Sequence, residues 1–330
     1  MNHQSGMKTR RSTIFRTAGT LIAIALLVYL LNRMGWEDIQ KAFSKLTIYQ
    51  LGLSFGLIII SRLAVSARWY ILLHSAEMGI SFQQSVRITF AGLFASNFLP
   101  TTIGGDVVRL AGAVQSKVDP ATSTASLVVD RLIGMAGMFL ALPFGVFSLI
   151  NYQSSFKQTA SMLLIIAAGI SKDWFSKLWS RSKNFVQKII YAGKIWIRKP
   201  GSLLLSFAFT LIHMLGIFFT IDILLTAMDE DITFLTISGL YSLVYFITLL
   251  PFTINGYGLQ ELSITFLFHN LSGISIESAL TMSIILRTLV ILASLPGAFF
   301  VGDMISAAGA LSTSSQVQSD EIPDLKPPID

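Results

Sequence analysis

An apolar stretch at residues 86–114 is interrupted by Leu99-Pro100-Thr101-Thr102-Ile103-Gly104-Gly105-Asp106. A second apolar stretch, at residues 233–271, is interrupted by Leu250-Pro251-Phe252-Thr253-Ile254-Asn255-Gly256-Tyr257-Gly258. Proline removes a backbone N–H donor and glycine permits left-handed geometry, so each interruption predicts a sharp turn after which a helix restarts. We expect the restarted helices to begin near Asp106 and Gly258.

The two interruptions resemble each other in residue type and spacing. The pattern Leu-Pro-x-x-Ile-Gly-Gly at residues 99–105 aligns with Leu-Pro-x-x-Ile-Asn-Gly at residues 250–256. An acidic residue follows each break, and an arginine follows each acid about one helix further along the chain. These observations predict the ion pairs Arg131–Asp106 and Arg287–Glu261. A purely structural role in packing is the alternative interpretation of such buried pairs.

The composition is that of a chain surrounded by lipid. Hydrophobic residues make up 53% of the 330 residues and charged residues 13%, against about 25% charged in an ordinary soluble domain. This excludes an ordinary soluble enzyme, a disulfide scaffold and a nucleic-acid-binding protein. There is no cysteine, and the four histidines lack metal-ligand spacing. The sequence therefore predicts neither a metal nor another cofactor.

Apolar stretches of about 20 residues predict transmembrane helices. They lie at residues 14–31, 48–73, 124–150, 156–170, 203–226 and 276–302. With the two broken segments, they predict an all-α integral membrane protein of about six to eight transmembrane segments. We expect one polytopic domain over residues 1–302, with halves at about 48–150 and 201–302.

A basic segment at residues 171–200 joins the predicted halves. It has eight lysines and arginines and one acid, and its Trp174 and Trp196 recur with other apolar residues at near-helical spacing. This pattern predicts an amphipathic helix that lies on an anionic membrane face. The polar, acidic tail at residues 303–330 contains prolines and is expected to be disordered.

The distribution of lysine and arginine predicts a topology in the cell (plasma) membrane. The N-terminus and loop 171–200 should be cytoplasmic. That arrangement requires residues 86–114 to enter and leave on one side as a re-entrant hairpin, because a full span would place the basic loop outside. The two units would then have opposite orientations. Such an inverted repeat, with broken helices near the midplane, is typical of transport sites.

Charged side chains inside apolar segments are the second functional signal. They are Arg62, Arg68, Arg109, Asp130, Arg131, Asp222, Glu261 and Arg287. An arginine at mid-membrane costs about 2.5–3.5 kcal/mol on insertion scales. We expect Arg68 to reach the cytoplasmic interface and Asp222 to be solvated. Asp130 and Arg131 are adjacent and should not pair simply with each other.

The broken segments and these charges define a candidate substrate-binding site without catalytic residues. Its residues are Arg109, Arg131, Arg287, Gly104, Gly105, Asp106, Asn255, Gly256, Gly258 and Glu261. The restarted helices carry partial positive charge at their N-termini, which suits a phosphate group. The arginines would attract an anionic head group, and the two acids would hold or gate the arginines.

The chain resembles the flippase-like family of the lysylphosphatidylglycerol synthase transmembrane region. The resemblance rests on Arg68-Trp69, on residues 97–109 with their Gly-Gly-Asp break, on Asp130-Arg131-Leu132-Ile133-Gly134, and on residues 251–261 with Gly-x-Gly-x-x-Glu. The chain departs from the family pattern at Thr101 and Asn255. Well-understood relatives carry an aminoacyl-transferase domain that we do not expect here, so the resemblance does not imply an enzyme.

The resemblance implies a protein that moves an anionic or polar lipid between leaflets, such as a phospholipid or a polyprenyl-phosphate-linked sugar. Movement would follow a gradient or be coupled to protons through Glu261 or Asp106. An intramembrane lipid-phosphate transferase is one alternative. A non-catalytic membrane partner of a glycosyltransferase or lipid-synthesis enzyme, recruited through residues 171–200, is the other.

The predicted topology can be tested by cysteine labelling, because the native chain has no cysteine. Lys183→Cys should react with an impermeant maleimide only after the cells are permeabilised, whereas Asp231→Cys should react in intact cells. Labelling of residue 183 from outside intact cells would contradict the hairpin topology.

Overall fold

The computed structural model describes residues 36–99, 104–151, 195–249, 255–302 and 304, and every regular element in these ranges is helical. The elements are α2 (Trp36–Ser44), α3 (Ile48–Ser75), α4 (Phe82–Ser96), α5 (Gly104–Gln115), α6 (Pro120–Asn151), α9 (Pro200–Ala227), α10 (Phe234–Thr248), α11 (Leu259–Ser272), α12 (Ile276–Ser294) and the 3-10 helix η1 (Leu295–Gly297). Helical residues continue from η1 to Gly302. The all-helical prediction is therefore confirmed for the part of the chain that the structure describes.

Four helices are long and apolar enough to cross a membrane. They are Ile48–Ser75, Pro120–Ser148 within α6, Pro200–Ala227 and Ile276–Gly302. They coincide with four of the predicted spans. The other two, at residues 14–31 and 156–170, lie outside the described residues, as do most of the basic loop and nearly all of the tail.

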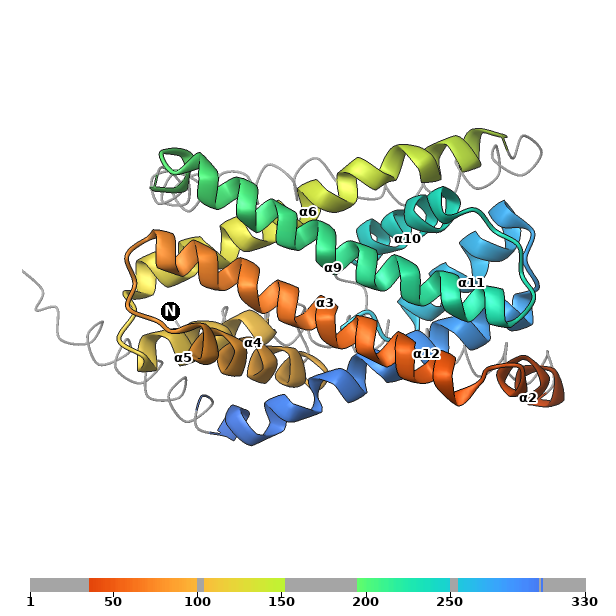
Figure 1. Cartoon of the computed structure of the whole chain (residues 1–330), viewed down its shortest axis with the longest axis horizontal. Helices are drawn as coiled ribbons and strands as arrows, with labels where there is room; N and C mark the ends of the chain where they lie inside the picture. Colours follow the sequence, from red (N-terminus) through yellow and green to blue (C-terminus); the bar gives the residue numbers. More distant parts are fainter. Residues whose placement is uncertain (1–35, 100–103, 152–194, 250–254, 303, 305–330) are drawn as a thin grey trace, which may run out of the picture.

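Each broken segment is a pair of short helices packed against each other. α4 has 15 residues and α5 has 12, while α10 has 15 and α11 has 14. At about 1.5 Å per residue they extend roughly 18–22 Å, less than the ~30 Å hydrocarbon core of a bilayer. Figure 1 shows the α4–α5 pair at one end of the molecule and the α10–α11 pair at the other, with both breaks near the middle.

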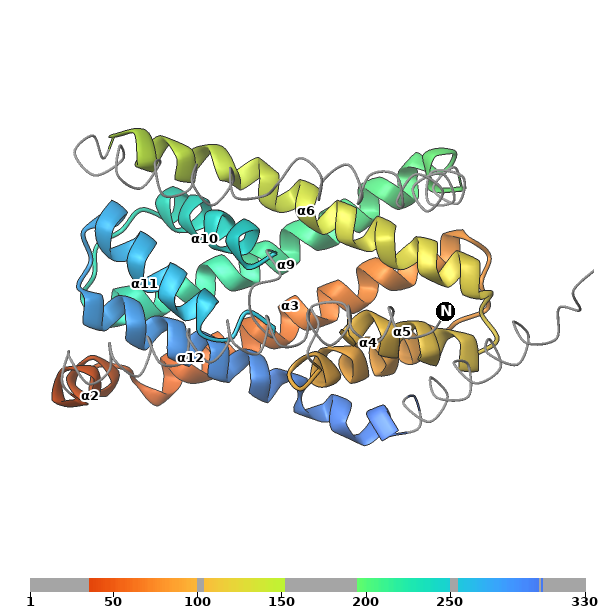
Figure 2. The same cartoon turned by 180° about the vertical axis from the view of Figure 1, so that it is seen from behind.

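The two halves repeat the same element order, and the first two helices of each half have equal lengths. α3 and α9 both have 28 residues, and α4 and α10 both have 15. α3 packs along α9, and the two helices run in opposite directions in both views (Figures 1 and 2). One long helix, a hairpin and a second long helix therefore occur twice, in opposite directions.

One end of the molecule, here called the basic end, holds residues 195–199 against the C-terminus of α3. The Lys199 ammonium donates to the Ser75 carbonyl at 2.6 Å and contacts Glu77 at 3.1 Å. The Trp196 indole donates to the Leu72 carbonyl at 2.9 Å and is 1% exposed. The prediction that Trp196 faces the membrane surface is wrong, because its ring fills a gap between α3 and α6.

The opposite, acidic end is tied together by Lys45 and Glu230. Lys45 donates to the Met228 carbonyl at 3.2 Å and pairs with Asp229. Glu230 accepts from the Ser275 backbone N–H and hydroxyl at the start of α12. Partial burial acts to raise the pKa of Glu230, but hydrogen bonds from Ser275 and Ser278 outweigh it and lower that pKa. The link is therefore fully formed at neutral pH and is lost only as the pH falls through the lowered pKa.

Residues 36–44, for which the sequence predicts no element, form α2 at the acidic end. Its Ala42 is buried, while Glu37, Gln40 and Lys41 are exposed. α2 packs against α12. The helix is short and rich in polar residues, so it gives no apolar-span signal and was missed.

The first break depends on close approach rather than on left-handed backbone. Gly104 and Gly105 are helical, so the prediction that they adopt left-handed geometry is wrong. A Cβ on Gly105 would lie 2.6 Å from the Gly92 carbonyl oxygen of α4, and a Cβ on Gly92 would meet the Gly105 carbonyl oxygen. Paired glycines let the two backbones touch, as small residues do between membrane helices.

The second break has the left-handed residues that the sequence predicts. Asn255 has φ 48°, Gly256 has φ 72° and Gly258 has φ 75°. Gly258 is also the N-cap of α11. Asparagine and glycine are the residues that adopt this backbone region most readily, so the Asn255 departure from the family pattern is compatible with the turn.

Gly105→Ala should force α4 and α5 apart and destabilise the protein by about 1–3 kcal/mol, the usual cost of overpacking. Gly52→Ala is the matched control, because a Cβ there meets no atom within 4 Å. Thermal unfolding in one detergent compares the two variants. Equal melting temperatures would show that the α4–α5 contact does not depend on glycine.

Candidate anion-binding site

The two halves meet around a cavity of about 350 Å³. α5 contributes to its wall from the first hairpin, and the tip of the second hairpin contributes Asn255 and Gly256. Five arginines and two aspartates line it: Arg62, Arg68, Arg109, Arg131, Arg287, Asp106 and Asp130. A cavity with this many guanidinium groups, enclosed by apolar spans, is suited to an anion.

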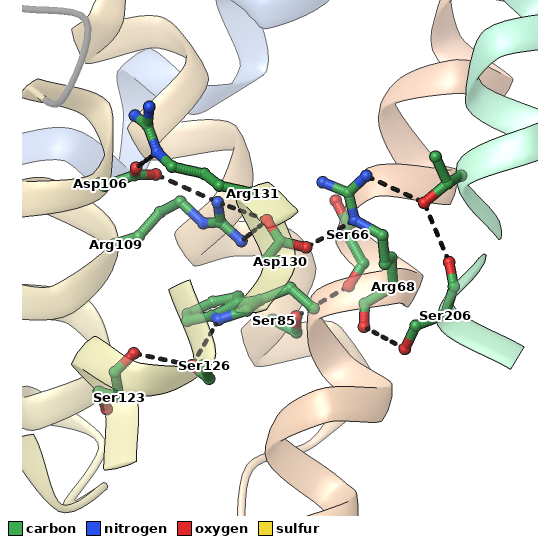
Figure 3. Close-up of polar contacts among 12 residues, drawn as sticks. Ser66, Arg68, Ser85, Asp106, Arg109, Ser123, Ser126, Asp130, Arg131 and Ser206 are labelled. Carbon is green, nitrogen blue, oxygen red and sulfur yellow. Dashed lines mark hydrogen bonds and ion pairs between the residues drawn. The ribbon is translucent and has the colours of Figure 1, made fainter. Parts of the chain in front are cut away.

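Asp130 of α6 is the centre of the charge network. It is 1% exposed and accepts from the Arg68 Nε atom at 2.6 Å through one oxygen. Its other oxygen accepts from the two terminal nitrogens of Arg109 at 3.1 and 3.2 Å. Figure 3 shows the carboxylate lying between the two guanidinium groups. One buried carboxylate therefore joins α3, α5 and α6.

Arg68 is a buried structural cation and not an interfacial one. Its side chain is 8% exposed, and its guanidinium also donates to the Thr210 hydroxyl of α9 at 3.2 Å. The prediction that Arg68 reaches the interface is wrong, because Asp130 and Thr210 bind it inside the bundle. Sequence reasoning correctly excluded a simple Asp130–Arg131 pair but did not identify the partners of Asp130.

Asp106, in the first turn of α5, binds two arginines. It accepts from Arg131 Nε at 2.5 Å and from Arg109 at 3.2 Å. Arg109 also lies over the Trp69 ring at 4.4 Å, and Trp69 in turn donates to the Ser126 hydroxyl. The predicted Arg131–Asp106 pair is confirmed in the structure, and Arg109 is held from three sides.

The predicted Arg287–Glu261 pair is also formed. Arg287 Nε donates to Glu261 at 2.6 Å, as Arg131 Nε does to Asp106. The terminal nitrogens of Arg287 donate to the backbone carbonyls of Asn255 and Gly256 at 3.5 and 3.3 Å. Arg287 therefore fixes the backbone of the second break as well as neutralising Glu261.

Arg62 of α3 differs from the other cavity arginines. No ion pair or side-chain hydrogen bond joins it to another described residue, whereas the other four each have a carboxylate partner. Its cavity neighbour His213 bonds the Ser61 hydroxyl at 2.6 Å where α3 crosses α9. Arg62 was predicted to be a charge within an apolar segment but was not included in the site. The sequence does not show whether an arginine has an acidic partner on another helix.

The cavity has a net positive charge. Five arginines are balanced by Asp106, Asp130 and the Glu261 partner of Arg287, which leaves +2 with His213 neutral. We count His213 as neutral because a further positive charge beside Arg62 and Arg68 would be repelled. An anion is the ligand that would compensate this charge.

The predicted site residues divide into two groups. Those that line the cavity are Arg109, Arg131, Arg287, Asp106, Asn255 and Gly256. Gly104, Gly105, Gly258 and Glu261 lie outside its lining and instead shape the breaks or hold Arg287. Asp106 and Glu261 already place a negative charge in the first turns of α5 and α11, so the arginines contribute more than the helix dipoles.

The four long apolar helices with a charged cavity between them define a polytopic membrane protein. The chain belongs to the family of the lysylphosphatidylglycerol synthase TM region, which it matches over residues 16–297. It is 24% identical over 290 residues to a UPF0104 membrane protein of Archaeoglobus fulgidus, covering 76% of this chain and 86% of that relative. It is therefore a multi-pass membrane protein, as the resemblance implied.

Arg287→Ala should destabilise the protein by about 3–5 kcal/mol, because it leaves a buried carboxylate uncompensated. Glu261→Gln should cost less, since the amide oxygen still accepts from Arg287. Glu77→Gln is the matched control in an exposed pair with Lys199, where a cost of about 0–1 kcal/mol is expected. Unfolding in detergent gives the ranking, and equal stability of all three variants would exclude a buried ion pair.

Proposed function

We propose that this protein is flippase-like and translocates a lipid with an anionic or polar head group between leaflets. The head group would occupy the cavity while the tails remain in the bilayer. In this proposal the α4–α5 and α10–α11 hairpins are re-entrant from opposite membrane faces. The halves then form an inverted-topology repeat around a midplane site.

The proposal rests on the position of Arg62 in the cavity without an acidic partner among the described residues. An arginine in a membrane is costly, and a guanidinium without a carboxylate partner in the described part of the chain has its donors available to a ligand. The positive net charge of the cavity supports the same conclusion. A phosphate group on a lipid has the charge and the acceptor oxygens that guanidinium binds best.

The charges at the two ends support an orientation. At the basic end, α4 and the segments before α6 and α9 carry Arg87, Lys117, Arg198 and Lys199, with Glu77 and Asp119 as the nearby acids. At the acidic end, α2 and the segment next to it carry two lysines, Lys41 and Lys45, and the acids there include Asp229, Glu230, Asp231 and Glu277. By the distribution of lysine and arginine, the basic end would be cytoplasmic, with the N-terminus and loop 171–200 on that side of the plasma membrane.

The proposal is a transport function and not an enzymatic one. The cavity carboxylates Asp106 and Asp130 are both bonded to arginines, which makes them poor general bases or metal ligands in this state. A lipid-synthesis enzyme or glycosyltransferase remains a proposed partner, because a transported lipid must be made on one side and used on the other.

Arg62→Gln should reduce translocation of a fluorescent anionic phospholipid in proteoliposomes by about tenfold to a hundredfold, the value of one charge-assisted hydrogen bond. Arg62→Lys should retain part of the activity, because it retains the charge. Arg198→Gln removes an exposed cation outside the cavity and should behave as wild type. Dithionite quenching of the outer leaflet gives the rate. Wild-type rates in Arg62→Gln would rule out this site for the head group.

A further inference from the structure

The charge of the cavity narrows the class of lipid. This inference rests on the proposed function and concerns the head group alone. An uncompensated charge in a low-dielectric interior is costly, so the loaded cavity should be close to neutral. The cavity residues have a net charge of +2, so the ligand that makes the loaded cavity neutral has a charge of about −2.

A phosphate monoester has that charge and a phosphate diester does not. A monoester carries about −1.5 to −2 at neutral pH and presents three terminal oxygens, whereas a diester carries one negative charge. The donors also match. Arg62 has no partner among the described residues, and the Nε of Arg109, whose residue is 7% exposed, is a buried donor that no described group accepts. Two arginines on different helices, Arg62 of α3 and Arg109 of α5, thus retain donors for the additional phosphate oxygen.

The cavity is partly open and has room for a phosphate head group. About 350 Å³ lies at the lower end of the roughly 300–1,000 Å³ of small-molecule sites. Bulky side chains, Met138, Tyr245 and Leu249, form part of the wall.

We propose that the cavity selects lipids whose head group is a phosphate monoester dianion over lipids whose head group is a phosphate diester. The hydrocarbon chains of the lipid are not specified, because the cavity residues recognise the phosphate. Arg62 is the residue that sets the selectivity, because it supplies the charge that the internal carboxylates leave uncompensated.

Two probes differ in one methyl group and one charge: dioleoyl phosphatidate and dioleoyl phosphatidylmethanol. Binding is measured with the purified full-length protein in detergent, from the lipid concentration that gives half of the maximal thermal stabilisation. Wild type should bind phosphatidate about tenfold to a hundredfold more tightly than phosphatidylmethanol. Dioleoyl phosphatidylglycerol, which has the same charge as phosphatidylmethanol and a larger head, should bind no better than phosphatidylmethanol.

The variant Arg62→Gln lowers the net charge of the cavity to +1, so its preference for phosphatidate should disappear or reverse. Arg198→Gln should keep the wild-type ratio. Equal binding of phosphatidate and phosphatidylmethanol by wild type, or an unchanged ratio in Arg62→Gln, would overturn the proposal. Inorganic phosphate tests the need for a lipid, and stabilisation by phosphate alone at the phosphatidate concentration would overturn the assignment to a lipid.

Translocation in proteoliposomes separates this inference from the proposed function. If both probes cross the membrane at equal rates and bind equally, the protein is a flippase without the proposed selectivity. If neither crosses but the binding ratio holds, the selectivity stands and the transport function fails.

Discussion

The arrangement around the cavity depends on one buried carboxylate, Asp130. Without it, Arg68 and Arg109 would be two like charges side by side inside an apolar bundle, at a cost that membrane helices rarely sustain. With it, α3, α5 and α6 are fixed relative to one another, and Arg68 reaches Thr210 on α9. The same contact places the first turn of α5 so that Asp106 meets Arg131. The cavity is thus built on a charge network that is mostly satisfied internally.

The repeat is symmetric in its backbone and asymmetric in its charges. Arg131 and Arg287 occupy the same position in α6 and α12, and Asp106 and Glu261 the same position in α5 and α11. The remaining network is confined to one half: positions corresponding to Arg68, Arg109 and Asp130 are occupied in the second half by Thr220, Ile264 and Leu286. Four of the five cavity arginines therefore belong to the first half, and the second half supplies Arg287, neutral polar side chains such as Thr248 and Gln260, and the carbonyl-rich break.

This difference explains which features could be predicted from the sequence. The ion pairs of Arg131 and Arg287 were predictable because the repeat presents each pair twice at nearly the same spacing. The Asp130 pairs occur once, and their partners lie 62 and 21 residues away on other helices, so only packing reveals them. The role of Gly105 was misjudged for the same reason, since its close approach to Gly92 depends on a neighbouring helix. The left-handed turn at Asn255 and Gly256 is local, and local chemistry was enough to predict it.

The distribution of ion pairs also bears on how the halves can move. Among the described residues, every ion pair at the cavity lies within one half: Arg68, Arg109 and Arg131 pair within the first, and Arg287 within the second. At the cavity, the contacts that the described residues make between the halves are hydrogen bonds rather than ion pairs. They include the Ser61–His213 bond, the Asn97–Ser294 bond at the first hairpin tip and the Arg68–Thr210 bond, whose donor is charged. Breaking a buried ion pair costs about 3–5 kcal/mol, whereas exchanging a neutral hydrogen bond costs about 0.5–1.5 kcal/mol. Rocking of one half against the other, as alternating access requires, would therefore leave the buried ion pairs of the cavity intact. It would exchange hydrogen bonds and the exposed pairs Lys45–Asp229 and Lys199–Glu77 at the two ends, which are worth about 0–1 kcal/mol each.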